Sequence, residues 1–192
     1  RDKVFFNNSI GDISAVDIKS GNLIWQTPTQ SSSIYENAFL LKTSDLVTDN
    51  KSILFSNNRN EFFSLDIFTG AINWQKKINS TIRPVLIDKL IFTISNEGFL
   101  VILDKDSGEI ARITNIFSEI KEKKRKNIIP VGFIVGVDNI YLTTSHGRLI
   151  IINILKGKTS SILKIANKKI SRPFILNENL FIIKDNSIIK LN

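Results

Sequence analysis

Several residue types and patterns are missing from this sequence of 192 residues. It has no cysteine, no methionine and a single histidine, His146. The lack of cysteine excludes disulfides and thiolate metal sites in these residues, and one histidine cannot form a multi-histidine zinc site. No apolar run approaches the roughly 18 to 20 residues that span a bilayer. Because the chain starts at Arg1 rather than methionine, we expect a further N-terminal portion that carries any signal sequence.

The composition favours an all-β protein with many turns. Hydrophobic residues make up 42% of the chain, which is enough to bury a core, and isoleucine, asparagine and lysine are common. Isoleucine favours strands, whereas asparagine favours turns and tolerates left-handed backbone. The net charge of +8 is open to two interpretations. It is either general surface charge or a means of attracting nucleic acid or anionic lipid.

A short pattern recurs along the chain, with Asp or Asn four residues before Gly. It begins at residues 17, 66, 104 and 153, and the final Asn192 stands where the next copy would begin. The Asp side chain can accept hydrogen bonds from the amides of a following turn, and Gly supplies a positive φ. The pattern therefore predicts a hairpin turn and not a catalytic carboxylate. The structural repeat positions are Asp17, Gly21, Trp25, Asp66, Gly70, Trp74, Asp104, Gly108, Asn153 and Gly157.

The residues between these turns predict four short antiparallel strands per repeat of 38 to 49 residues. That spacing is typical of a β-propeller blade. We expect a partial all-β propeller with full blades at about 44–78, 83–114 and 130–165 and blade remnants at 1–27 and 172–192. The expected total is eighteen strands, about four and a half blades, which does not close a ring. We therefore expect a larger propeller of about eight blades.

The repeat resembles that of the pyrroloquinoline-quinone-type propellers, in which the pattern Asp-x-x-[Ser/Thr]-Gly-x-x-x-Trp recurs. In that family the tryptophan packs between neighbouring blades. Trp25 and Trp74 match the family pattern, whereas Arg112 and Ser161 stand at the same position in later repeats. The resemblance implies that the contacts at those two positions are built differently.

Within that family, residues 83–108 and 184–192 resemble a lipoprotein member that acts in outer-membrane β-barrel assembly. The resemblance implies a non-enzymatic scaffold in the periplasm, attached to the outer membrane by a lipid anchor outside this stretch. It implies a protein partner, the barrel-forming subunit of the assembly machinery, and no cofactor. It assigns no catalytic or metal residue.

Two other functions stay open at this point. One is a quinone-dependent dehydrogenase, whose family resemblance implies a vicinal cysteine pair, a calcium site and a catalytic aspartate. The other is an extracytoplasmic propeller with an unidentified ligand. We interpret His146 as a turn residue, and we find no phosphate loop, serine triad or paired-histidine motif.

Two repeats are longer because of insertions at 30–42 and 115–126. Both carry apolar residues at helical spacing and are expected to form one or two helical turns, which need packing to persist. They either cap the blade edge or form a rim that docks a partner. The basic run 121–126 lacks the interleaved aromatics of single-strand nucleic-acid binding, so we expect no nucleic-acid partner. The candidate partner-binding residues are Ile34, Tyr35, Phe39, Ile116, Phe117, Lys121, Lys123, Lys124, Arg125 and Lys126.

Overall fold

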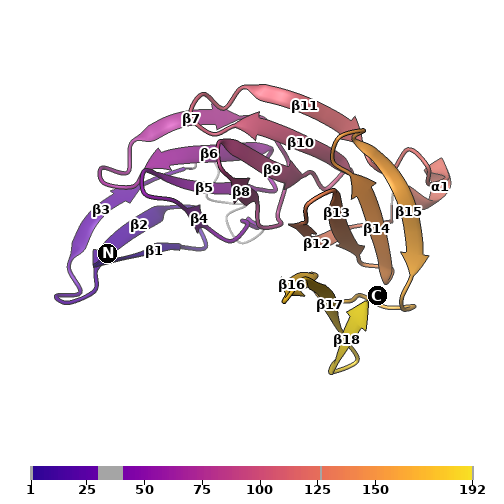
Figure 1. Cartoon of the computed structure of the whole chain (residues 1–192). Helices are drawn as coiled ribbons and strands as arrows, with labels where there is room; N and C mark the ends of the chain where they lie inside the picture. The colour runs from indigo at the N-terminus through magenta and orange to yellow at the C-terminus, as the bar shows by residue number, and fades with distance from the viewer. Residues whose placement is uncertain (1, 30–40, 126, 192) are drawn as a thin grey trace. The chain divides into compact units, whose positions relative to one another are not determined.

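The structure is a computed structural model that describes residues 2–29, 41–125 and 127–191. Within those residues it contains eighteen strands and one short helix (Figure 1). The chain divides into two compact units. One holds residues 1–84 and 106–108, and the other holds residues 85–105 and 109–192.

The first unit carries two antiparallel sheets whose strands follow one another in chain order. The three-stranded sheet consists of β1 (Lys3–Asn7), β2 (Ile13–Asp17) and β3 (Leu23–Thr27). The four-stranded sheet consists of β4 (Val47–Thr48), β5 (Ser52–Asn57), β6 (Glu61–Asp66) and β7 (Ile72–Lys76).

The second unit carries three antiparallel sheets with the same consecutive order and the single helix, α1 (Glu122–Arg125). The first sheet consists of β8 (Val85–Ile87), β9 (Leu90–Ile94), β10 (Phe99–Asp104) and β11 (Ile110–Asn115). The second consists of β12 (Pro130–Val135), β13 (Asn139–Thr144), β14 (Arg148–Asn153) and β15 (Lys158–Lys164). The third consists of β16 (Phe174–Leu176), β17 (Asn179–Lys184) and β18 (Ser187–Leu191).

The second and third strands of each full sheet are buried on both faces. All six residues of β5 are buried, and β10 is buried from Leu100 to Leu103. The fourth strands are mostly exposed, with Trp74 the one buried residue of β7. This burial explains the near-continuous apolar runs of the central strands, because a strand that is covered on both sides has no polar face. In the first unit, Phe55 stacks on Phe63 with ring centroids 5.1 Å apart.

A β-bulge recurs at one place in four of the sheets, just after the Asp-x-x-x-Gly turn. Ala15 pairs with Trp25 while Val16 pairs with Leu23, so Ile24 is the extra residue. The same shift leaves one extra residue in each of β7, β11 and β15, namely Asn73, Ala111 and Ser160. A bulge increases the local twist and re-aims the next side chain. The residue that follows each bulge is Trp25, Trp74, Arg112 or Ser161.

The predicted fold class is confirmed, since the described residues form three four-stranded and two three-stranded antiparallel sheets with the predicted eighteen strands. The expected helical turn in the second insertion exists, but it lies at Glu122–Arg125 and not on the apolar residues Ile116 to Ile120. The ring of about eight blades stays a prediction.

Candidate functional site

The recurring aspartates organise turns, as the sequence predicts. Asp17 Oδ1 accepts the backbone N–H of Lys19 at 3.1 Å and of Ser20 at 2.7 Å, and the Ser20 hydroxyl at 2.8 Å. Asp66 Oδ1 accepts the equivalent three bonds from Phe68 and Thr69. Gly21 and Gly70 close these turns with φ of 72° and 74°. These carboxylates are therefore structural groups.

The same hydrogen bonds set the acidity of the two carboxyl groups. The backbone N–H of Ser20, followed by its hydroxyl, holds the pKa of Asp17 below its usual value of 3.8. The backbone N–H and then the hydroxyl of Thr69 lower the pKa of Asp66 in the same way. A carboxylate that accepts several hydrogen bonds is favoured in its charged form, so both groups stay ionised at neutral pH.

The two tryptophans of the repeat pack against the turn glycine of the following repeat. A Cβ at Gly70 would lie 2.5 Å from Trp25 Cε3, and one at Gly108 would lie 2.6 Å from Trp74 Cδ2. Trp74 also stacks on Phe62 of its own sheet, with ring centroids 5.8 Å apart. The family expectation for these tryptophans agrees with this geometry. Each indole ring occupies space that any side chain larger than hydrogen would need.

Arg112 occupies the position of the tryptophan in the third repeat and makes a polar contact instead. Its Nη1 donates to the carbonyl oxygens of Ile154 at 2.7 Å and Leu155 at 3.0 Å. The guanidinium also lies against Gly157, where an added Cβ would come within 3.4 Å of Nη1. The structure thus gives the different contact that the departure from the family pattern implies.

The apolar start of the second insertion is part of the core. Ile116 and Phe117 are 0% and 1% exposed. The Ile116 N–H donates to the Gly98 carbonyl at 3.0 Å, and the Phe117 ring covers Gly98 so closely that a Cβ there would lie 2.1 Å from it. The expectation that these two residues offer an exposed surface to a partner is wrong, because a buried side chain cannot reach a partner without opening the blade.

The basic residues of the run 121–126 that the structure describes have two different environments. The Arg125 guanidinium donates to the backbone carbonyls of Ile120 and Ser118, the latter at 2.7 Å, so it braces its own loop. Lys121, Lys123 and Lys124 are exposed. The predicted partner residues Ile34, Tyr35, Phe39 and Lys126 lie outside the described residues, and their role stays a prediction.

An open pocket of about 380 Å³ lies beside α1, and we name it the α1 pocket. Its polar side chains include His146 and the amides of Asn127 and Asn167. The His146 Nδ1 lies 3.0 Å from the Ser145 hydroxyl, which accepts the Ile129 N–H. The Ser145 hydroxyl thus contacts both the Ile129 backbone and the His146 ring. The cations of the pocket are Lys123, Lys124, Arg148 and Lys164.

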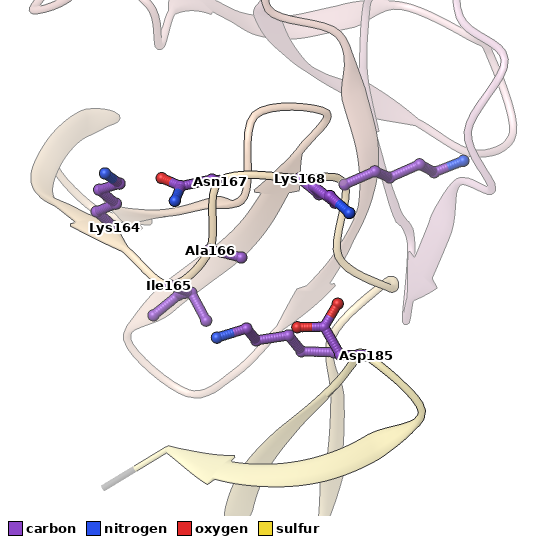
Figure 2. A pocket seen from close by; sticks show the side chains of 8 residues that line it. Lys164, Ile165, Ala166, Asn167, Lys168 and Asp185 are labelled. Atoms are coloured by element: carbon purple, nitrogen blue, oxygen red, sulfur yellow. The ribbon is translucent and has the colours of Figure 1, made fainter.

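A second open pocket, of about 360 Å³, adjoins the first and shares Lys164 and Asn167 with it; we name it the β17–β18 pocket. In Figure 2 the Lys164, Asn167 and Lys168 side chains lie along one side and Asp185 on the other. Its cations are Lys164, Lys168, Lys169 and Lys184. Since four cations line each pocket and Lys164 counts in both, the pair gathers seven cations around one carboxylate.

Neither a metal-ligand cluster nor a membrane-spanning helix occurs in the part of the chain that the structure describes. No group of three or more His, Asp or Glu side chains in residues 2–29, 41–125 and 127–191 lies close enough together to hold a metal ion. No helix in the same ranges has the length and hydropathy to cross a membrane.

Of the residues that line the two pockets, the sequence analysis named Lys123 and Lys124 as candidate partner-binding residues and named none of the others as such. Arg148, Lys164 and Lys184 lie at the ends of β14, β15 and β17, and Lys168 lies in the connection after β15, so they are scattered along the sequence. The order of the strands is a feature of the sequence-based prediction that indicates which connections lie together. In an antiparallel sheet alternate connections lie at the same end, so the connections after β11, β13, β15 and β17 share one end of their blades.

Comparisons with known proteins agree with the repeat and the fold. A family model described as outer membrane protein assembly factor BamB matches residues 1–114. The chain is 22% identical over 142 residues to an uncharacterised protein of Rickettsia prowazekii (strain Madrid E), covering 72% of this chain and 34% of that protein. It is also 22% identical over 143 residues to BamB of Yersinia pestis, covering 71% of this chain and 36% of that protein. The chain therefore spans about a third of the length of these curated relatives.

Two solved structures show the fold. BamB from Moraxella catarrhalis matches with a TM-score of 0.60 and 16% identity, over 99% of this chain and 69% of that one. The Cps50 (Swd1) β-propeller domain of Myceliophteria thermophila matches with a TM-score of 0.71 and 12% identity, over 94% of this chain and 58% of that one. At these identities the likeness concerns the propeller fold alone.

Proposed function

Because the chain belongs to the family of the outer membrane protein assembly factor BamB, we propose that it is a non-enzymatic scaffold in outer-membrane β-barrel assembly. Its partner in this proposal is the barrel-forming subunit of the assembly machinery. The protein works in the periplasm, attached to the outer membrane by a lipid anchor outside these residues. The family match over residues 1–114 is the observation that carries the proposal.

The repeat alone also fits a quinone-dependent dehydrogenase, so the choice between the two depends on the family match. The matching model and one of the curated relatives both bear the name of an assembly factor. No observation in the described residues favours the dehydrogenase over that role. The assembly role is therefore the function we propose.

The loop between β11 and β12 is the docking surface that we propose within the described residues. Ser118, Glu119 and Lys121 are exposed on it. Phe117 fixes one end of the loop in the core, and the Arg125 guanidinium holds its turn through the carbonyls of Ser118 and Ile120. A loop that is held in place before binding loses less conformational entropy on docking. This rigid support favours the loop as a binding element.

The proposal is tested by a pull-down of the full chain with purified soluble domains of the barrel-forming subunit. We expect the unsubstituted chain to bind and the variant Ser118→Arg/Glu119→Lys/Lys121→Glu to bind at least about tenfold more weakly, as loss of a docking loop predicts. The control is Lys89→Glu/Asp106→Lys, which reverses the charge at two turns between strands and leaves the loop unchanged.

Two outcomes contradict parts of the proposal. If the unsubstituted chain does not bind, the assembly role is wrong for this chain. If both variants bind as well as the unsubstituted chain, the scaffold stands and the docking surface is not this loop.

A further inference from the structure

The α1 pocket and the β17–β18 pocket form one basic surface, whose lining does not include the exposed docking-loop residues Ser118, Glu119 and Lys121. Their seven cations and Asp185 give a formal charge of +6, against +8 for the whole chain. Seven of the 26 lysine and arginine side chains therefore line two adjoining pockets that share Lys164 and Asn167, with one carboxylate among them. Like charges that line one surface repel one another, and an anion bound among them offsets that repulsion.

The walls of the pockets are held by backbone hydrogen bonds. Ile165 N–H and Ala166 N–H both donate to the Gly147 carbonyl at 2.9 Å, which fixes the loop that carries Lys164 and Lys168. A Cβ at Gly147 would lie 2.5 Å from the carbonyl oxygens of Ala166 and Lys168, so the turn and this loop are in direct contact. The lysine backbones are thus positioned before any ligand binds, and a preorganised site binds at lower entropic cost.

The connection after β11, which carries Lys123 and Lys124, is hydrogen-bonded to the turn between β13 and β14. The Ser145 N–H donates to the Ile129 carbonyl at 2.9 Å, and the Ile129 N–H donates to the Ser145 hydroxyl at 3.1 Å. Three connections, after β11, β13 and β15, are in this way cross-linked into one rigid end of the blade. Both pockets are features of this packed end and do not depend on one mobile side chain.

The cations in this site are available to a ligand. Within the part of the chain that the structure describes, no ion pair joins Lys124, Lys164 or Lys168 to a carboxylate. The directional donors that complete the site are the side-chain amides of Asn127 and Asn167. Long-range attraction from the lysines and directional bonds from these donors are the two elements that recognition of an oxyanion requires.

The number of cations favours phosphate over carboxylate, because a phosphate monoester carries about two negative charges and a carboxylate carries one. Arginine binds either group through a planar two-point contact, whereas lysine binds phosphate as a point charge. Arg148 is the one arginine among the seven cations. We propose that the paired pockets bind a phosphate-bearing ligand, with one anionic group in each pocket and Lys164 between them. The phosphate comes either from the headgroups of anionic lipids or from a soluble phosphate compound.

The test uses the full chain with four probes. Inorganic pyrophosphate and a polyglutamate peptide are titrated by calorimetry, and vesicles of phosphatidylglycerol or of phosphatidylcholine are used in flotation. The pocket variant is Lys124→Gln/Lys164→Gln/Lys168→Gln. The matched control, Lys89→Gln/Lys156→Gln/Lys158→Gln, removes three exposed lysines at the opposite ends of the blades. Circular dichroism checks that both variants keep their sheets.

We expect the unsubstituted chain and the control to bind pyrophosphate or phosphatidylglycerol vesicles, and the pocket variant to bind about a hundredfold more weakly, since each lysine contributes roughly fivefold. Binding to pyrophosphate identifies a soluble phosphate ligand, and binding to phosphatidylglycerol alone identifies a lipid headgroup. Equal losses in both variants would show general charge attraction and overturn the proposal. No binding to any probe, or equal binding to a polyglutamate peptide, would overturn it as well.

Discussion

The tryptophan contacts of the first unit and the arginine contact of the second both fill the space beside the turn glycine of the following repeat, one with an aromatic ring and the other with a guanidinium. Trp74 places its ring on Gly108 and on Phe62 and is 9% exposed. Arg112 reaches the turn of Gly157 with two hydrogen bonds and stays exposed. In these two repeats the position after the bulge carries a long side chain that is aimed at the next turn, apolar in one and polar in the other, whereas the fourth repeat has the short Ser161 there.

The energetic consequence differs between the two contacts. Burying an aromatic ring removes a large apolar area from water. Exposed hydrogen bonds replace bonds that the same groups make to water, so their net contribution is small. We therefore expect the tryptophan contacts to contribute more to stability than the arginine contact.

The largest expected effect is that of Trp74→Ala. Removal of a buried indole leaves a cavity between Phe62 and Gly108, so we expect a loss of about 3 to 5 kcal/mol in the free energy of unfolding. Urea denaturation followed by fluorescence or circular dichroism measures it. The control Trp74→Phe keeps a ring on Phe62 and is expected to lose less than half as much. A loss below about 1 kcal/mol for Trp74→Ala would contradict the comparison.

A comparison of the variants Gly70→Ala and Gly21→Ala separates the effect of backbone strain on stability from the effect of steric overlap. Both glycines have nearly the same φ, 74° and 72°, but a Cβ at Gly21 meets nothing within 4 Å, whereas one at Gly70 lies 2.5 Å from Trp25 Cε3. We expect Gly21→Ala to lose about 1 kcal/mol. Gly70→Ala is expected to lose about 1 to 3 kcal/mol more, because the indole must move.

Urea denaturation of both variants, fitted with one shared m-value, gives the midpoint of each and so the difference in their free energies of unfolding. Equal losses would mean that Trp25 moves aside without cost and that the glycine is required by the turn alone. In that case the contact between indole and glycine would not be a determinant of blade packing.

Arg112→Ala is expected to have a smaller effect. Loss of the bonds to the carbonyls of Ile154 and Leu155 is expected to lower the free energy of unfolding by about 1 kcal/mol, because water replaces the guanidinium at an exposed site. Arg112→Lys keeps the charge but not the planar donor group, so it recovers only part of that loss. Urea denaturation of the two variants tests this. A loss equal to that of Trp74→Ala would refute the proposed difference between the contacts.

The smallest effect concerns acid stability. The folded pKa values of Asp17 and Asp66 lie below 3.8. The stability they add is present above the unfolded pKa and is lost as the pH falls through the folded pKa. The variant Asp17→Asn/Asp66→Asn is therefore expected to lose less stability than the unsubstituted chain between about pH 4 and pH 2.

Asparagine is a matched replacement at these turns because Asn153 holds the same position in a later repeat, where its Oδ1 accepts the Lys156 N–H at 2.9 Å. Thermal unfolding at a series of pH values measures the difference between the chains. Parallel acid curves would show that the two carboxylates do not contribute to the pH dependence.

The repeat made most of the fold predictable. Asp17 and Gly21 identify a turn from local chemistry alone, and the spacing of the copies gives the strands between them. The role of Phe117 was not predictable in this way. Its place beside Ile116 and Ile120, which stand at helical spacing, suggested a helical turn that offers an apolar side chain to a partner, whereas the ring is buried over Gly98, nineteen residues earlier in the chain. Sequence periodicity describes neighbours along the chain and does not record such a contact.

By itself, the sequence determined the all-β class, the blade repeat, the turn role of the aspartates and the absence of thiol chemistry in these residues. Each of these depends on local backbone preference or on composition. The tertiary structure alone decided the bulge that aims Trp25, Trp74 and Arg112, the burial of Ile116 and Phe117, and the gathering of Lys164 with Lys124 and Lys168 in adjoining pockets. These features arise where residues distant in sequence meet, because antiparallel strands return alternate connections to the same end of a blade.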